Sequence, residues 1–494
     1  MKIISSETMR DLDARTIANK RVASLELMER AGKQCSEQIE LFCSQLAPHH
    51  KKRLIILCGP GNNGGDGFVI ARYLTSKFEV KTYCTHKQDK LSPDAKTNSS
   101  KVSELCEFEA SSQLLNKITE GDIIIDCLFG TGLNRALTGE YETLVNSINA
   151  SQLPVISVDS PSGLLSDGQV PSAAIKATIT LSIGLPKTSY FQNDGPAHVG
   201  SLINLDIGFS KDYITQAPSE GQAFFAQDAK KTLQSFTYNS HKYTRGQCLI
   251  IAGSELYNGA PIIAADSAAV SGAGMVILAH ESLRTPQNPG IICLTKPPDI
   301  IKSHFFEKSQ SVLIGPGIEI NDKNKKLFTH LIKSDKALVI DASAIDLIAD
   351  NKTLFPRNAP TIITPHAGEL QRLAKGLNIN HSDLSKAAQH IAQNLSIQVL
   401  LKGPQSKIYN EQGAFSYNTS GNWALSTAGS GDALAGIIAS LWAKKDINYY
   451  EQAQLGCFIH GKSVDFYTGA KRSFTVDLFP SLISKVLHSL SPLA

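Results

Sequence analysis

The sequence lacks the features that would assign it to a secreted, membrane or nucleic-acid-binding class. Its nine cysteines include no Cys-x-x-Cys pair and are odd in number, which argues against a disulfide framework or a zinc site. Its 48 basic and 45 acidic residues give a formal net charge of +3, too small to indicate nucleic acid or a membrane surface as a partner. It shows no apolar signal segment and no apolar run long enough to span a bilayer. We therefore expect a cytoplasmic protein with reduced thiols.

Short apolar runs instead alternate with helical patterns along the 494 residues, 42% of which are hydrophobic. The runs of the first half begin at Leu54–Cys58, and several are apolar on both faces, as buried parallel strands are. A second series begins at Cys248–Ala252. Two such series exceed what one sheet comfortably holds. We predict two α/β domains that meet in the polar stretch between Phe209 and His241.

A glycine-rich run, GPGNNGGDG, occupies residues 59–67 and follows a predicted strand. Its five glycines predict a loop with positive φ angles and close backbone approach to a ligand, followed by a helix that starts near Phe68. The amino end of that helix favours an anion. The run matches neither the Rossmann fingerprint nor a P-loop. Two interpretations of the run therefore remain open, namely a nucleotide-binding loop and a tight structural turn.

Two further predicted strands in the first half end in an aspartate. Asp126 ends IIIDCLFG and Asp159 ends VISVDSPSG. Because ligands bind at the carboxyl ends of parallel strands, both carboxyls are expected to converge on the glycine-rich run, unless each merely caps the next helix. Asn63, Asp126 and Ser162 offer oxygen ligands, which suit a hard cation better than zinc.

The second half carries four signals at strand ends or helix starts: Gly315–Gly317, Thr364–His366, Lys402–Pro404 and Ala428–Asp432. The last, with Gly-Ser-Gly-Asp opening a helix, predicts an anion site for a phosphoryl group. Its aspartate could accept a proton, although an unshifted pKa of roughly 4 would make it a weak base. The alternatives are that Asp432 only caps an ordinary helix, that His366 is structural, and that Lys402 is a surface lysine.

The motifs GPGNNGGDG, DCLFGTGL and VDSPSG together resemble the YjeF N-terminal domain, the NAD(P)H-hydrate epimerase, over roughly residues 1–215. The resemblance implies a Rossmann-like three-layer α/β/α fold and a potassium ion held by Asn63, Asp126 and Ser162. It implies that substrate is bound by Asn62, Asn63, Gly64, Gly65, Asp66, Gly130, Thr131, Gly132, Leu133, Asn134, Arg135, Ala136 and Asp159. Ser160 stands where the family more often has isoleucine, at a position that is not a ligand.

The motifs GAGM, GPG, TPHAGE, LKGP and AGSGDALAG resemble, as a set, the YjeF C-terminal domain over roughly residues 225–490. That family is the ribokinase-like, ADP-dependent NAD(P)H-hydrate dehydratase. The resemblance implies that the hydrated nucleotide contacts Ala260, Gly317, His366 and Asp432. It implies that ADP contacts Lys402, Gly403, Pro404, Gln405, Ser406 and Gly431. The sequence has Asp-Ala-Ser at 341–343 where the family usually has Asp-Ala-Asp, which leaves a second carboxylate there in question.

Together the two resemblances imply a fused repair enzyme for NADH and NADPH that have added water across the 5,6 double bond. The first domain would interconvert the R and S hydrates at C6, with Asp159 as the proton-transfer residue. The second would dehydrate the S epimer with ADP and Mg²⁺, with Asp432 as the proton acceptor, and release AMP and phosphate. The resemblance also favours a homo-oligomer. A small-molecule kinase of the ribokinase type and a non-catalytic nucleotide sensor are the alternatives.

Overall fold

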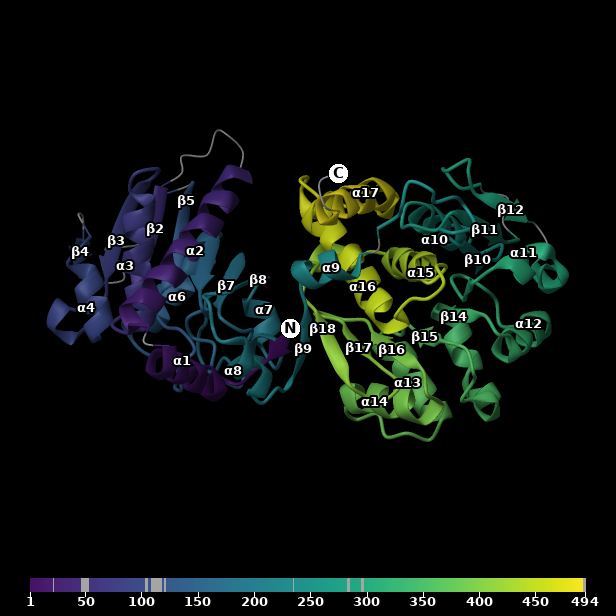
Figure 1. Ribbon diagram of the computed structural model, residues 1–494, viewed down its shortest axis with the longest axis horizontal. Helices are drawn as coiled ribbons and strands as arrows, with labels where there is room; N and C mark the ends of the chain where they lie inside the picture. Colours follow the sequence, from purple (N-terminus) through teal and green to yellow (C-terminus); the bar gives the residue numbers. More distant parts are fainter. Residues whose placement is uncertain are drawn as a thin grey trace. The chain divides into compact units, whose positions relative to one another are not determined.

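Buried strands form the centre of two α/β units, each with helices against its sheet (Figure 1). The computed structural model describes residues 1–20, 22–45, 53–102, 105–107, 118–119, 121–233, 235–281, 285–294 and 297–491. The first unit is Met1–Gln222 and the second is Ala223–Ala494. The predicted α/β class with two domains is confirmed, whereas the finer domain bounds, 1–215 and 225–490, stay predictions.

The first unit has a sheet of seven parallel strands in the order β4-β3-β2-β5-β6-β7-β8. They are β2 (Arg53–Cys58), β3 (Glu79–Cys84), β4 (Leu105–Glu107), β5 (Asp122–Cys127), β6 (Val155–Val158), β7 (Ile179–Ile183) and β8 (Ser201–Leu205). In this sheet β3 lies beside β2 on one side and β5 lies beside it on the other, so the strand order reverses at β2. This reversal places the binding crevice of the sheet at the carboxyl ends of β2 and β5.

Alternation of side chains along these strands builds two apolar layers in the first unit. In β2, Leu54 and Ile56 pack with α2 (Ser24–Gln45) and α3 (Asn62–Leu74), and Ile55 and Leu57 pack with α6 (Glu140–Ser151). The other elements are β1 (Lys2–Ile3), α1 (Ser6–Lys20), η1 (Gln88–Lys90), α4 (Pro93–Ser99), η2 (Thr188–Tyr190), α7 (Gly195–His198) and α8 (Lys211–Gln216). The strand β9 (Gly221–Phe224) begins in the first unit and ends in the second. β1 pairs antiparallel with the start of β9, which the sequence pattern did not predict.

The second unit has its strands in the order β18-β17-β16-β15-β14-β13-β10-β11-β12. The strands from β12 to β16 are parallel, and β16, β17 and β18 are antiparallel. They are β10 (Gln247–Ile251), β11 (Met275–Ala279), β12 (Ile292–Leu294), β13 (Ser311–Ile314), β14 (Ala337–Ile340), β15 (Thr361–Ile363), β16 (Gln398–Leu401), β17 (Lys407–Tyr409) and β18 (Phe415–Asn418).

Helices cover both faces of this second sheet. α10 (Ala260–Ala269), α15 (Ser430–Leu441) and α16 (Tyr449–Asp465) pack on one face, and α12 (Asp322–Lys333), α13 (Ala367–Gly376) and α14 (Leu384–Leu395) on the other. The remaining helices are α9 (Ala226–Thr232), η3 (Pro297–Lys302), α11 (His304–Lys308), η4 (Ala342–Leu347), η5 (Ala349–Leu354), η6 (Trp423–Leu425), η7 (Lys471–Ser473), η8 (Val476–Leu478) and α17 (Phe479–Leu490).

Two expectations drawn from composition concern the described part of the chain. None of its helices combines the length and the apolar character needed to cross a bilayer. Eight of the nine cysteines have described side chains, and none of these eight forms a disulfide. Seven are buried and Cys293 is exposed. Cys106 lies outside the residues whose side chains are described.

Candidate active sites

The glycine-rich run of the first unit is largely helical. α3 begins at Asn62, with Gly61 as its N-cap, so the predicted start near Phe68 is wrong. None of the five glycines between 59 and 67 has a positive φ, so the predicted left-handed loop is wrong as well. The helix end that favours an anion is therefore formed by Asn62 and Asn63.

The glycines of this run serve close packing. A Cβ on Gly64 would lie 1.9 Å from the carbonyl oxygen of Gly59, and one on Gly67 would lie 2.7 Å from Cys58 Sγ. A Cβ on Gly65 would meet a methionine side chain at 2.6 Å. Packing of the helix start against β2 and its neighbours thus outweighs the low helix propensity of glycine.

Asp126 is fully buried at the end of β5 and accepts four hydrogen bonds. Ser162 donates to it twice, from Oγ at 2.6 Å and from its backbone N at 2.9 Å. Ser157 Oγ donates at 2.8 Å and Leu128 N at 3.3 Å. Burial raises the pKa of Asp126, and the hydrogen bonds act in the opposite direction. The carboxyl fixes the Ser162 turn against β5, so the structure brings these two predicted residues together.

Asn63 has a buried side-chain amide that is suited to a ligand. Its Oδ1 and Nδ2 are both buried without a hydrogen-bond partner among the described residues. Buried polar groups are nearly always paired, so an orphaned amide indicates a missing ligand. A Cβ on Gly130 would lie 3.4 Å from Asn63 Cγ, and Phe129 N donates to Ser162 Oγ at 2.9 Å. Asn63 and Ser162 therefore both lie against residues 129–130, and their oxygens fit a hard cation such as K⁺.

Asp159 follows β6 with a φ of +64°, a conformation that is rare outside glycine. Its Oδ2 accepts from Thr131 N at 3.1 Å and from Thr131 Oγ1 at 3.2 Å, so it contacts the predicted substrate segment. Its Oδ1 accepts from Lys187 Nζ at 2.6 Å. Lys187 is fully buried and was not predicted. The available signal was its place in Gly-Leu-Pro-Lys, directly after β7.

Two more carboxyls face this pair. Burial raises the pKa of Asp66 well above its usual range, and the nearby charges of Asp159 and Asp13 add to the rise. Burial also raises the pKa of Asp13 to about 6, with Lys187 acting in the opposite direction. Asp66 was predicted from the glycine-rich run. Asp13 was not, because it lies on α1, where the sequence shows only an ordinary polar helix.

The other predicted residues of the first site are more exposed. Asn62 accepts a hydrogen bond from Ser92 Oγ at 2.8 Å. In the glycine-rich segment after β5, three residues are exposed, namely Gly132, Asn134 and Arg135. The other four are half-buried, namely Gly130, Thr131, Leu133 and Ala136. The segment is therefore open to a ligand beside Asp159.

In the second unit, Asp432 lies in the first turn of α15, whose N-cap is Gly429 with a φ of +88°. A Cβ on Gly431 would lie 3.2 Å from Lys402 Nζ, so the helix start and this lysine meet. Burial raises the pKa of Asp432 to about 7, with Asp341 and Glu369 adding to the rise and Lys402 opposing it. Asp432 is therefore a stronger base at neutral pH than its ordinary pKa predicts.

Lys402 is half-buried and paired, so it is not a surface lysine. Its Nζ lies 2.9 Å from Asp341 Oδ1 and 3.8 Å from Glu369 Oε2. Thr364 Oγ1 donates to the same Asp341 oxygen at 2.6 Å. Burial lowers the pKa of Lys402, but the two carboxylates outweigh it and raise the pKa overall. Glu369 is thus a second carboxylate near Lys402, at a different position from Ser343.

His366 forms the N-cap of α13. Its Nδ1 accepts from Gly368 N at 3.0 Å, and its own backbone N donates to Glu369 Oε2 at 2.8 Å. Its side chain is 57% exposed, with Nε2 3.5 Å from Glu369 Oε1. The capping role favours the structural alternative, and the exposed ring edge leaves ligand contact open.

The remaining predicted residues of the second site form two small groups. Gly317 has a φ of +67°, and a Cβ there would lie 3.3 Å from Ala260 Cβ, so these two residues adjoin. After β16, Gly403 and Pro404 are exposed, and Ser406 Oγ donates to the Gly403 carbonyl at 3.2 Å. Gln405 has a φ of +54° and a buried Oε1 without a partner in the described structure. That oxygen, like the Asn63 amide, is available to bind a ligand.

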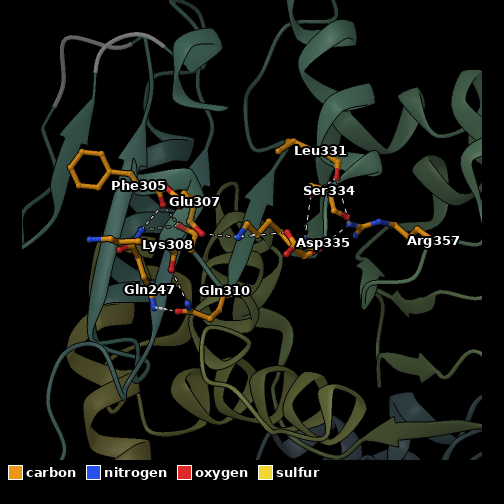
Figure 2. A network of polar contacts seen from close by, with 11 residues as sticks. Gln247, Phe305, Glu307, Lys308, Gln310, Leu331, Ser334, Asp335 and Arg357 are labelled. Carbon is orange, nitrogen blue, oxygen red and sulfur yellow. Dashed lines mark hydrogen bonds and ion pairs between the residues drawn. The ribbon is translucent and has the colours of Figure 1, made fainter. Parts of the chain in front are cut away.

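A separate polar cluster of the second unit lies at the amino ends of its strands, away from the site at their carboxyl ends (Figure 2). A cavity of about 750 Å³ opens there. Gln247 Nε2 donates to Phe305 O at 2.6 Å, and Arg357 donates to the carbonyls of Ser334 and Lys336 at 2.7 and 2.9 Å. These groups bind one another, which indicates a structural role. Nowhere in the described ranges do three or more His, Cys, Asp or Glu side chains form a group suited to a metal ion.

Comparison with known proteins identifies both halves of the chain. The family described as YjeF-related protein N-terminus matches residues 24–189, and the NAD(P)H-hydrate dehydratase family matches residues 248–487. The second unit also resembles the crystal structure of an ADP/ATP-dependent NAD(P)H-hydrate dehydratase from Bacillus subtilis, co-crystallized with ATP/Mg²⁺. That match has 22% identity and a TM-score of 0.49, and covers 55% of this chain and 99% of that one.

Relatives of full length share both halves. A bifunctional NAD(P)H-hydrate repair enzyme of Dictyoglomus turgidum is 30% identical, and the match covers 99% of this chain and 98% of the relative. An enzyme of the same description from Thermofilum pendens is 33% identical, with 83% of this chain and 82% of the relative covered. The chain therefore belongs to the family of bifunctional NAD(P)H-hydrate repair enzymes.

Proposed function

We propose that the first unit interconverts the R and S hydrates of NADH and NADPH, and that the second unit dehydrates the S hydrate with ADP. Membership of the bifunctional family supports both activities. The observation that carries the proposal furthest is Asp432, a half-buried acid with a pKa of about 7 at the start of α15. An acid in that state suits a proton acceptor at neutral pH.

In the first unit, the reacting carbon is C6, which carries the hydroxyl and is bonded to the ring nitrogen. Epimerisation needs a proton transfer that lets C6 become planar and then re-form with either configuration. We assign this transfer to Asp159, whose carboxylate contacts Thr131 of the segment beside it. Residues 130–136 and the helix start at Asn62–Asp66 would bind the substrate. A potassium ion held by Asn63, Asp126 and Ser162 would supply a fixed positive charge, a role that the unpartnered Asn63 amide supports.

In the second unit, the C6 hydroxyl is a poor leaving group until it is phosphorylated. Asp432 would accept the hydroxyl proton as the oxygen attacks the β-phosphorus of ADP, and AMP would leave. The ring nitrogen would then expel phosphate, and loss of the C5 proton would restore the reduced ring. Backbone N–H groups of residues 429–431 would stabilise the transferring phosphoryl group.

The remaining ligands of the second site follow the same scheme. The hydrated nucleotide would contact Ala260, Gly317 and His366. Residues Lys402–Ser406 and Gly431 would contact ADP, which the orphaned Gln405 oxygen supports. Mg²⁺ is usually bound through one or two carboxylates together with substrate phosphates, so it would enter with the nucleotide. On the family resemblance alone, we further propose a homo-oligomer located in the cytoplasm.

The test incubates the purified protein with mixed R and S NADH hydrate, Mg²⁺, K⁺ and either ADP or ATP. The return of the near-ultraviolet absorbance of NADH is followed. Recovery from both epimers would support both activities. Recovery that stops at the S fraction would refute the epimerase, and no recovery would refute the dehydratase. A stable phosphorylated product without NADH would favour a kinase of the ribokinase type instead.

A further inference from the structure

We propose that Lys187 is a positioning residue of the first site, which fixes the carboxylate of Asp159 by a buried ion pair and so prepares it for proton transfer. This inference rests on the proposed epimerase function. Lys187 was not part of the predicted site, and it acts through Asp159 without touching the substrate.

The contacts of Asp159 divide its two oxygens between different partners. Oδ1 accepts from Lys187 Nζ at 2.6 Å, and Oδ2 accepts from both donors of Thr131. A second contact, from Lys187 Nζ to the carbonyl of Ile183 at 2.7 Å, anchors the ammonium to the end of β7. The Asp159 side chain is 17% exposed, whereas that of Lys187 is fully buried. Substrate can therefore reach the carboxylate of Asp159, while Lys187 binds the same carboxylate from its buried side.

The backbone of Asp159 is held from the same side. Its φ of +64° is a strained conformation for a residue other than glycine, and such conformations persist where the surroundings enforce them. Tyr190 OH donates to the Asp159 carbonyl, and Tyr190 lies in the short helical turn that follows Lys187. One segment, 187–190, thus fixes both the main chain and the carboxylate of Asp159. That degree of restraint is typical of a group that must keep a reactive orientation.

The charges around the pair make the role of Lys187 testable. The groups that face it are Asp159, Asp13 of α1, Asp66 and Tyr190, and their charges raise or lower one another's pKa values. Cys35 of α2 also faces this group, and burial raises the pKa of its thiol. Lys187 lowers the pKa of both Asp13 and Asp66, whereas Asp159 raises both. Removing the lysine would therefore take a buried positive charge away from three neighbouring carboxyls.

The experiment compares Lys187→Met and Lys187→Gln with Lys176→Met, which changes an exposed lysine of the same unit. Each full-length variant receives R-NADH hydrate and K⁺ without ADP, and chromatography follows the formation of the S hydrate from pH 5.5 to 9. The uncatalysed rate is subtracted at each pH. Lys187→Gln keeps a hydrogen-bond donor without the charge, and it serves if Lys187→Met fails to fold.

We expect Lys187→Met to lower kcat by about 100-fold at pH 7, as for a misplaced catalytic group, with KM changed less than threefold. We expect the acid limb of its pH–rate profile, and that of Lys187→Gln, to move to higher pH by at least one unit. Lys176→Met should match the unmodified protein. A loss that is equal at every pH, or an unchanged kcat, would overturn the inference. Asp159→Asn separates the two hypotheses, because full epimerase activity in that variant would refute the proposed role of Asp159 itself.

Discussion

Asp432→Asn is expected to stabilise the second unit while it abolishes the dehydratase activity. Burial raises the pKa of Asp432 from 3.8 to about 7, and the charges of Asp341 and Glu369 contribute. The folded state therefore binds the proton of Asp432 more tightly than the unfolded state. Below pH 3.8 both states are protonated and the group has no effect. Between pH 3.8 and 7 the folded state loses stability as pH rises, and above pH 7 the full penalty applies.

The size of this penalty follows from the shift. A rise of about three pKa units corresponds to about 4 kcal/mol at pH 8 and to less than half of that at pH 5. An asparagine has no charge to bury and avoids the penalty at either pH. We therefore expect the free energy of unfolding of Asp432→Asn to exceed that of the unmodified protein by about 2–3 kcal/mol more at pH 8 than at pH 5.

The chain offers a convenient assay, because both of its tryptophans, Trp423 and Trp442, lie in the second unit. Trp442 is fully buried, so urea unfolding followed by tryptophan fluorescence reports on that unit. Asp477→Asn, at an exposed position of the same unit, is the matched control. A gain in stability that is the same at pH 5 and pH 8 would show that packing, and not the buried charge, is responsible. No gain at pH 8 would refute the reasoning directly.

One further variant in each unit tests the geometry of that unit. Gly64→Ala should lower the free energy of unfolding by about 1–3 kcal/mol, because its Cβ would lie 1.9 Å from the carbonyl oxygen of Gly59. Gly61→Ala, with no neighbour within 4 Å, should change it by less than about 0.5 kcal/mol, and equal thermal shifts would contradict the packing role. Lys402→Met should raise KM for ADP and shift the acid limb of the dehydratase profile to higher pH, since Lys402 lowers the pKa of Asp432. A pH–rate profile with an unchanged limb would contradict this.

Most strands of both sheets could be predicted from the sequence, whereas β1, β4, β9 and the start of α3 could not. β11 coincides with the apolar run Met275–Ala279, because residues buried on both faces of a parallel sheet are often continuously apolar. β7 coincides with the predicted strand Ile179–Ile183, in which apolar residues alternate with Thr180 and Ser182. α3 begins inside a run of glycines and asparagines, which have low helix propensity. Gly64 is required by the approach of the Gly59 backbone, and Gly65 and Gly67 are required by side chains of α2, β2 and β5. These tertiary contacts leave no periodic pattern in the sequence.

Lys187 and Lys402 show a second limit of prediction from the sequence, which is that ion-pair partners cannot be identified. Asp159 and Asp341 each follow a parallel strand, and the sequence marks both as strand-end acids, but it does not show which cation each one meets. Lys187 pairs with Asp159 from 28 residues away, whereas Lys402 pairs with Asp341 across 61. Lys402 pairs with Asp341, and Asp432 forms no ion pair with the described residues. Burial raises the pKa of Asp432 to about 7, with Asp341 and Glu369 adding to the rise and Lys402 opposing it. The spacing of an acid along the chain thus predicts where it lies. Its state of charge depends on its burial and on the charges that lie around it, which the fold alone determines.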